Sequence, residues 1–414
     1  MNLFDLLAIL ITLSALFSYI NHRHMRLPTG IGLILIAISL SLALTFLAHF
    51  GIEVDEQARR IVSSIDLSRA LLGGMLSFLL FAGALHVDLG HLLANKWTIA
   101  ILATFGVTVS ALLIGLVLWW LVGFFGFQIP FLYCFLFGAL ISPTDPVAVL
   151  SILKSAGARP SLEAKICGES LFNDGIGVVL FALLFESLQS PNGLQATDFL
   201  FLFVKEAGGG LIMGLLGGYI CYRMLKSVDG YKVEVLITLG LVTGGYAAAM
   251  HLHTSGPIFV VVSGLMIGNR GRRLAMSENT RQHLDNFWEM VDEVLNAVLF
   301  VLIGLEVLTL QLNLNIILLS LLVIPTVLAT RFFTVSIPVS FMRLFRDFSP
   351  GAIRILTWGG LRGGISVALA LSLPNGPERD LLLPLTYCVV VFAIVVQGLT
   401  IGPLIRRIEN QHNI

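Results

Sequence analysis

Long apolar stretches alternate with short polar connections along almost the whole chain. A helix needs about 20 mostly apolar residues to cross the hydrocarbon core of a membrane. Measured against that length, the pattern predicts an all-α, polytopic membrane protein with about thirteen transmembrane helices. Their approximate bounds are 3–21, 28–50, 69–90, 97–123, 129–153, 165–187, 199–222, 233–251, 256–269, 287–308, 314–341, 351–373 and 381–405.

The polar connections differ in positive charge. The connections after the odd-numbered segments, together with the C-terminal end, carry most of the 25 Lys and Arg residues. The remaining connections carry Arg59, Arg60, Arg69 and Arg379. Because Lys and Arg collect in cytoplasmic loops, this bias predicts an N-terminus outside the cell and a C-terminus in the cytoplasm.

Two of the apolar segments contain residues that interrupt helices. The fifth segment contains SPTDP at 142–146, and the twelfth contains WGGLRGG at 358–364. Each proline removes a backbone donor and disfavours the helical conformation of the preceding residue, and glycine is a poor helix former. Interrupted helices at matching positions in two halves are typical of transporters built from inverted repeats, with a binding site near the membrane midplane. We therefore predict inverted repeats in which helices 5 and 12 are unwound and cross.

The spacing of the two interruptions also predicts the internal organisation of one transmembrane domain over residues 1–414. Helices 5 and 12 lie seven segments apart, and an odd offset inverts the second copy relative to the first. We expect a first repeat over about 1–190, a linker helix over about 199–222, and a second repeat over about 233–407.

Composition supports the membrane class. Hydrophobic residues make up 57% of the chain and charged residues 12%, whereas about a quarter of the residues of a soluble domain are charged. The net charge is zero and no basic run suggests nucleic acid, so the expected surroundings are the lipid bilayer. The four cysteines show no paired spacing, which argues against a disulfide framework and a zinc site.

A polar cluster lies inside the sixth apolar segment, in the sequence GESLFNDGIG at 168–177. On a helix, Glu169 and Asn173 share one stripe, and Ser170 and Asp174 share the next. The four side chains therefore form one polar sector. A charged group at the bilayer centre costs about 2.5–3.5 kcal/mol on insertion scales and indicates a functional site.

The interruption in helix 5 supplies further oxygen atoms that could bind a cation together with the polar cluster of the sixth segment. Unwinding would free backbone carbonyls beside the Thr144 hydroxyl and the Asp145 carboxylate, and such oxygen ligands suit a hard cation such as Na⁺. Asp174 can in addition bind a proton, and it cannot hold a proton and a cation together. Competition of this kind is the minimum requirement for cation/proton exchange.

Two arginines lie within apolar segments, and each positive charge needs a negative charge or partial charge nearby. The inner ends of two half-helices carry partial charges, which Asp145 and Arg362 would balance from the two interrupted segments. Arg331 needs a carboxylate, and Glu169 is the one without another role. Removing one member of a buried ion pair costs about 3–5 kcal/mol, so we expect Glu169 and Arg331 to support the structure and Asp174 to carry transport.

Several of these motifs resemble signatures of the cation:proton antiporter 1 family, whose NhaP-type members are related to the sodium/proton exchangers of animals. The resembling stretches are ISPTDPVAV at 141–149, GESLFNDG at 168–175, WGGLRGGIS at 358–366 and, as the tenth helix, FWEMVDEVLNAVLFVLIGLEV at 287–307. The match covers essentially the whole chain in order.

The resemblance implies a thirteen-helix homodimer in the cell membrane. It also implies exchange of Na⁺ or Li⁺ for H⁺, without a cofactor, by an elevator-like movement of a core domain. Thr144, Asp145, Ser170 and Asp174 would bind the cation, and Asn173 would belong to the supporting network with Glu169 and Arg331. The Asn-Asp type is associated with electroneutral one-for-one exchange.

One position departs from the family pattern, and other functions stay open. The third helix of the family often reads Phe-Glu-Gly-Ala-Leu, whereas this chain has Ala82 at the acidic position, which leaves the choice of ion open. K⁺/H⁺ exchange is the rival among transporters, because oxygen ligands alone do not set the size of the site. An intramembrane aspartyl protease using Asp145 and Asp174 ranks lower, because its Gly-x-Gly-Asp setting is missing, and a channel is the third alternative.

Overall fold

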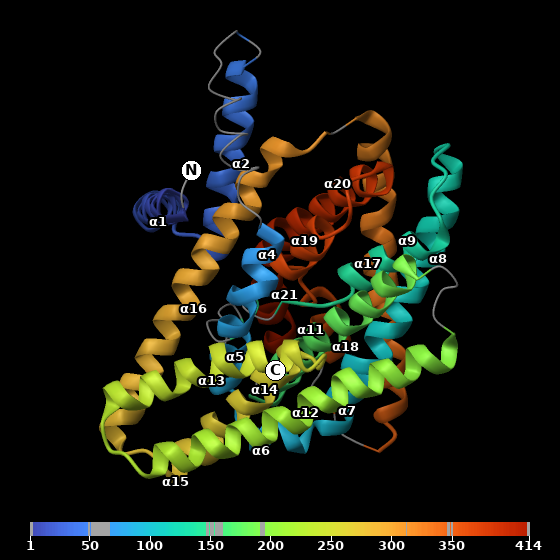
Figure 1. Ribbon diagram of the computed structural model, residues 1–414. Coiled ribbons are helices and arrows are strands. Elements are labelled where there is room, and N and C mark those ends of the chain that lie inside the picture. Colours follow the sequence, from blue (N-terminus) through green and yellow to red (C-terminus); the bar gives the residue numbers. More distant parts are fainter. Residues whose placement is uncertain are drawn as a thin grey trace.

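The computed structural model describes residues 3–48, 50, 67–145, 149, 153, 160–190, 195–311, 313–345, 348 and 351–411. Every regular element in these ranges is a helix, as the sequence predicts (Figure 1). Arg59, Arg60 and Pro146 lie outside the described residues.

The N-terminal half supplies the helices that correspond to the first seven apolar segments. In chain order they are α1 (Leu3–Ile20) with the π-helical turn η1 (Asn21–Met25), α2 (Thr29–Ala48), α4 (Leu67–Ala70) with η2 (Leu71–Met75) and α5 (Leu76–Leu85), the short α6 (Leu89–Ala94), α7 (Lys96–Ile101) with η3 (Leu102–Gly106) and α8 (Val107–Phe124), α9 (Phe131–Ile141), α11 (Pro160–Gln189) and α12 (Ala196–Lys226).

The C-terminal half supplies the remaining helices. They are α13 (Tyr231–His251), α14 (Gly256–Met266) with η4 (Ile267–Gly271) and α15 (Arg272–Leu274), α16 (Glu278–Glu306) with η5 (Val307–Thr309), α17 (Leu314–Met342), α18 (Ala352–Trp358), α19 (Gly364–Leu371), and α20 (Pro377–Phe392) with η6 (Ala393–Gln397) and α21 (Gly398–Asn410).

Many of these helices match the dimensions of a membrane. Within the described residues, eight helices are long and apolar enough to cross a bilayer: Phe4–Met25, Thr29–Leu47, Lys96–Phe124, Leu162–Gln189, Thr197–Lys226, Tyr231–His251, Leu314–Met342 and Pro377–Ile408. Leu71–Leu85 and Phe131–Ile141 are shorter apolar helices. The chain is therefore a multi-pass membrane protein.

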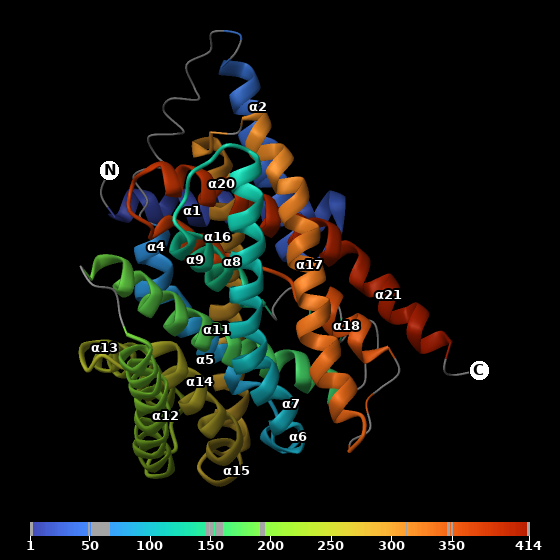
Figure 2. The ribbon, with the colours of Figure 1, turned by 90° about the vertical axis from the view of Figure 1, so that its right-hand side faces the viewer.

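The helices form two walls with a central group between them. In Figure 1, α2 and α16 lie together on one side, α8, α9 and α17 lie on the other, and α4, α5, α11 and α19 lie between. Figure 2, turned by 90°, shows α8 and α17 side by side in front of α16. The long α12 packs against α13 and α14 at one end of the molecule.

Several element boundaries differ from the predicted ones, and side-chain caps account for two of the differences. The third segment stops being helical at Leu85 rather than near residue 90, because the Asp88 carboxylate accepts a hydrogen bond from the amide of His91 (2.9 Å) and starts α6. The tenth segment begins at Glu278 rather than near residue 287, where the Ser277 hydroxyl accepts from the amide of Thr280 (3.4 Å). The predicted bounds come from hydropathy, which indicates where an apolar segment begins and ends. The helix itself begins at the residue whose side chain caps it.

Both interrupted segments contain a non-helical stretch within the described residues. The helix α9 ends at Ile141 and residues 142–145 are not helical; α18 ends at Trp358, and α19 resumes at Gly364. The amide of Asp145 donates a hydrogen bond to the carbonyl of Leu361 (2.8 Å), so the two non-helical stretches touch.

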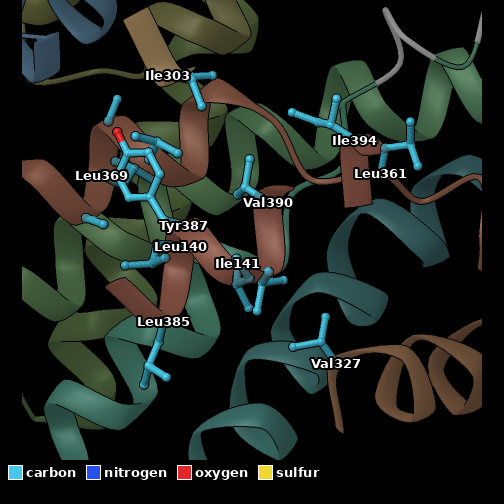
Figure 3. Packing of buried hydrophobic residues seen from close by; sticks show 14 of the residues in the cluster. Leu140, Ile141, Ile303, Val327, Leu361, Leu369, Leu385, Tyr387, Val390 and Ile394 are labelled. Atoms are coloured by element: carbon cyan, nitrogen blue, oxygen red, sulfur yellow. The ribbon is translucent and has the colours of Figure 1, made fainter. Parts of the chain in front are cut away.

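The largest apolar cluster surrounds this meeting point. Figure 3 shows Ile141 and Leu361, which flank the two interruptions, packed with Val327, Val390 and Ile394 from α17, α20 and η6. Each of these five side chains is at most 3% exposed. The irregular backbone is therefore enclosed by protein rather than lipid, as backbone with unpaired polar groups requires in a membrane.

Candidate ion-binding site

The helix α11 carries the four polar residues of the GESLFNDGIG stretch into the interior. Glu169, Ser170, Asn173 and Asp174 are each at most 3% exposed. All four lie within two turns of one continuous helix, so they occupy one polar sector, as the stripe argument predicts.

Asn173 holds the non-helical stretch after α9 against α11. Its side-chain amide donates to the Thr144 hydroxyl (2.7 Å), and its side-chain oxygen accepts from the Thr144 backbone amide (3.2 Å). One asparagine thereby satisfies a buried backbone donor and fixes the rotamer of the threonine. The Ser170 hydroxyl lies 3.0 Å from the Thr144 hydroxyl, so these two candidate ligands are adjacent.

Asp174 differs from its neighbours on α11. Its carboxylate is 3% exposed and makes no hydrogen bond to any part of the chain that the structure describes. Asp174 and Asp145 line the same cavity. A carboxylate in this position needs a proton, a cation or water to offset the cost of its burial.

The predicted pairing of Glu169 with Arg331 is present. Arg331 in α17 donates to the two carboxylate oxygens of Glu169 (2.5 and 2.9 Å) and to the carbonyl of Leu356 (3.2 Å). This two-pronged arrangement is the strongest geometry for an Arg–carboxylate pair. It ties α11 to α17 and to α18 close behind the candidate ligands.

Arg362 compensates the end of a helix rather than a carboxylate. Its guanidinium donates to the carbonyls of Ser142 and Pro143, the latter at 2.9 Å, just past the last turn of α9. The C-terminal end of a helix carries partial negative charge and unpaired carbonyls, which a cation stabilises. The sequence predicts the helix-end compensation but not these two acceptors.

Two glycines make room for this arrangement, and the sequence alone did not single them out individually. A Cβ atom on Gly360 would lie 2.8 Å from Nε of Arg331, and one on Gly363 would run into the Asp145 carboxylate. The signal was the density of glycine around Arg362, which marks a place where backbone and side chains approach closely.

A cavity of about 1740 Å³ leads to the candidate site. One face of α11 lines it, through Glu163, Cys167, Leu171 and Asp174. Residues of α1, α2, α5 and α16 also line it. Asp88 is another lining residue, and the hydrogen bond from the amide of His91 lowers the pKa of its carboxyl group. Ala82 also lines the cavity, and its methyl group adds no ligand.

The five ionisable groups described above at the site comprise one more carboxylate than guanidinium group. Asp145, Asp174 and Glu169 supply three carboxylates, and Arg331 and Arg362 supply two guanidinium groups. A single cation or a single proton would neutralise this set. The structure thus brings all eight predicted site residues together around the two interruptions.

Comparison with known proteins identifies the family. The family model for the transmembrane sodium/hydrogen exchanger matches residues 11–407. The chain is 50% identical over 409 residues to a Pseudomonas aeruginosa protein named Na(+)/H(+) antiporter NhaP, covering 98% of this chain and 96% of the relative. It is 36% identical over 364 residues to Na(+)/H(+) antiporter NhaH of Halobacillus dabanensis, covering 86% and 88%.

A solved structure gives the same fold. The sodium proton antiporter MjNhaP1 from Methanocaldococcus jannaschii, solved at pH 8, superimposes with a TM-score of 0.76 over 99% of each chain, at 18% sequence identity. At this low sequence identity the structural similarity shows only that the fold is shared. Membership of the family is shown by the family model and by the relatives with higher sequence identity. The chain therefore belongs to the sodium/hydrogen exchanger family.

Proposed function

We propose that the protein is a secondary antiporter that exchanges Na⁺, or Li⁺, for H⁺ across the cell membrane. The observation that carries the proposal is the state of Asp174, a buried carboxylate at a cavity wall without a hydrogen bond to the described chain. The relatives from Pseudomonas aeruginosa and Halobacillus dabanensis are named Na(+)/H(+) antiporters, which agrees with it.

In this proposal the cation binds to Asp174, Asp145, Thr144 and Ser170. The Thr144 hydroxyl accepts a hydrogen bond from Asn173, which orients its remaining lone pair, and Ser170 lies beside it. Carboxylate and hydroxyl oxygens are the ligands that hard cations prefer. Glu169, Arg331 and Arg362 position the ligands by fixing α11 and the two interrupted segments.

Asp174 holds the cation in one half of the cycle and a proton in the other. The one excess negative charge of the three carboxylates and two guanidinium groups at the site is neutralised equally by Na⁺ or by H⁺. The loaded core is then neutral in both halves, so no net charge crosses the membrane. We therefore propose one-for-one, electroneutral exchange.

We propose the following architecture for the transporter. Thirteen transmembrane helices form two inverted repeats, over about 1–190 and 233–407, joined by the linker helix at about 199–222. The two interrupted segments cross at the site, supported by the contact between Asp145 and Leu361. The N-terminus lies outside and the C-terminus in the cytoplasm, and two copies form a homodimer in which the core moves past a fixed dimer domain.

Transport by membrane vesicles tests the proposal. In everted vesicles, Asp174→Asn should abolish the recovery of a pH-gradient dye on addition of Na⁺ or Li⁺, because the amide binds neither a proton nor a cation with comparable affinity. Asp198→Asn makes the same chemical change on an exposed residue of α12 and should leave transport intact. Wild-type exchange by Asp174→Asn would refute the proposal, and recovery driven by K⁺ but not by Na⁺ would favour the K⁺/H⁺ alternative.

A further inference from the structure

A buried glutamine in the last predicted segment lies against the second interruption. Gln397 is 2% exposed and is the last residue of η6, the π-helical turn between α20 and α21. Its side-chain amide donates to the carbonyl of Trp358, the last residue of α18 (3.0 Å). Turns of this kind are rare and are frequent at functional sites. Gln397 thus gives the carbonyl at the end of α18 a partner that the interrupted helix does not provide.

Gln397 also lines a small void of about 10 Å³. Among the described residues, this void and the large cavity share no lining residue. The residues that line the void are Ile324, Val327, Leu328, Arg331, Gly360, Arg362, Val389, Phe392 and Gln397. Its polar side chains are therefore the two guanidinium groups of the candidate site and one amide. A volume of about 10–15 Å³ is the room that one water molecule needs.

The Arg331 guanidinium group has one nitrogen left for a further partner. Its two terminal nitrogens bind Glu169 and the carbonyl of Leu356. The third nitrogen, Nε, has no hydrogen-bond partner among the described residues. It lies next to Gly360, which lines the void, since a Cβ atom on Gly360 would be 2.8 Å from Nε. Buried donors are almost always paired, so an acceptor is expected on this side of the guanidinium group.

The Arg362 guanidinium group is held by the protein at one nitrogen. Nη1 donates to the carbonyls of Ser142 and Pro143, whereas Nε and Nη2 donate to no part of the chain that the structure describes. Arg362 is 2% exposed. A guanidinium group carries five N–H donors, so the remaining donors of Arg362 also need acceptors within the protein interior.

We propose that Gln397 is a positioning residue of the ion site. The void binds one water molecule, which accepts hydrogen bonds from Arg331 and Arg362 and donates one to the side-chain oxygen of Gln397. These partners match the two to four polar contacts that a buried water molecule makes. This inference rests on the proposed exchange, because the cation site is what gives the two arginines their role in transport.

The contact acts on the cation through the backbone that follows α9. Arg362 binds the carbonyls of Ser142 and Pro143, directly before the proposed ligands Thr144 and Asp145. If the water and Gln397 no longer hold the guanidinium group, this backbone is fixed less firmly. A binding site loses affinity when its ligands are held loosely, so the loss should be found in cation binding rather than in the exchange step.

The test measures the KM for Na⁺ in everted membrane vesicles. Gln397→Met keeps the length of the side chain but replaces the amide by a thioether. It should raise the KM for Na⁺ about three- to tenfold, the effect of losing about one net hydrogen bond. The maximal rate should stay within about twofold, because the exchange step uses Asp174. Gln397→Glu keeps an acceptor for the water and adds a negative charge, so its KM should stay at or below the wild-type value.

Thr400→Val is the matched control. The Thr400 hydroxyl accepts a hydrogen bond from the indole nitrogen of Trp358 (2.8 Å), so it joins the same two segments, but it does not line the void. Its loss should change the KM by about twofold at most, as for other exposed residues. An unchanged KM in Gln397→Met, or an equal rise in Thr400→Val or in Gln397→Glu, would overturn the role of Gln397.

A structure of the wild-type protein at a resolution that shows ordered water decides the case if Gln397→Met does not fold. One water molecule within hydrogen-bond distance of the Gln397 oxygen and of both guanidinium groups supports the inference, and a void without it overturns the inference. Each of these failures leaves the proposed exchange standing as long as Asp174→Asn is inactive. Transport by Asp174→Asn would instead refute the exchange mechanism itself.

Discussion

Three of the four polar side chains in the GESLFNDGIG stretch of α11 are bound by other residues. Glu169 pairs with Arg331, Asn173 holds Thr144, and Ser170 lies against the Thr144 hydroxyl. Asp174 has no such partner in the described chain. At the scale of residues, the cluster therefore separates into groups that hold the site in place and one group whose partner has to come from the cavity.

The ion pair behind the site yields a stability prediction. Glu169→Gln or Arg331→Gln each strands one buried charge, so each should lower the free energy of unfolding by about 3–5 kcal/mol. The double variant Glu169→Leu with Arg331→Met removes both charges and should lose clearly less than the sum. Unfolding by SDS in mixed micelles measures these differences, and additive losses would show that the pair is not coupled.

At the scale of elements, the two interrupted segments depend on each other. The Asp145 amide binds the Leu361 carbonyl, and Arg362 binds the carbonyls that follow α9. Each interruption therefore supplies hydrogen-bond partners that the other lost on leaving the helix, as buried irregular backbone requires. The site is built where these two stretches touch.

Gly360 gives a prediction for this junction. In Gly360→Ala the new methyl group would lie 2.8 Å from Nε of Arg331, so the guanidinium has to shift away from Glu169. We expect a loss of about 1–3 kcal/mol in the free energy of unfolding, with lower transport. Gly240→Ala on α13 is the control, because nothing lies within 4 Å of the new atom there, and it should be neutral or slightly stabilising. Equal effects of the two substitutions would contradict the account of the junction.

At the scale of the whole molecule, the sequence predicts most of the helices and the gathering of the eight candidate residues around the two interruptions. Hydropathy is sufficient for this because the bilayer sets the length of each apolar segment, and Pro143, Gly359 and Gly360 mark the interruptions. The sequence does not predict which helix faces which. The acceptors of Arg362, the contact of Gly360 with Arg331 and the void shared by Arg331 and Gln397 all depend on packing between segments far apart in the chain.

The central claim is that one carboxylate, Asp174, exchanges one proton for one cation. The most direct measurement counts the protons released when Na⁺ binds to the purified protein in weakly buffered solution, at a pH at which Asp174 carries a proton. The account predicts release of about one H⁺ for each Na⁺ bound, and none from Asp174→Asn. Na⁺ binding without proton release at every pH, or the same release from Asp174→Asn, would contradict it.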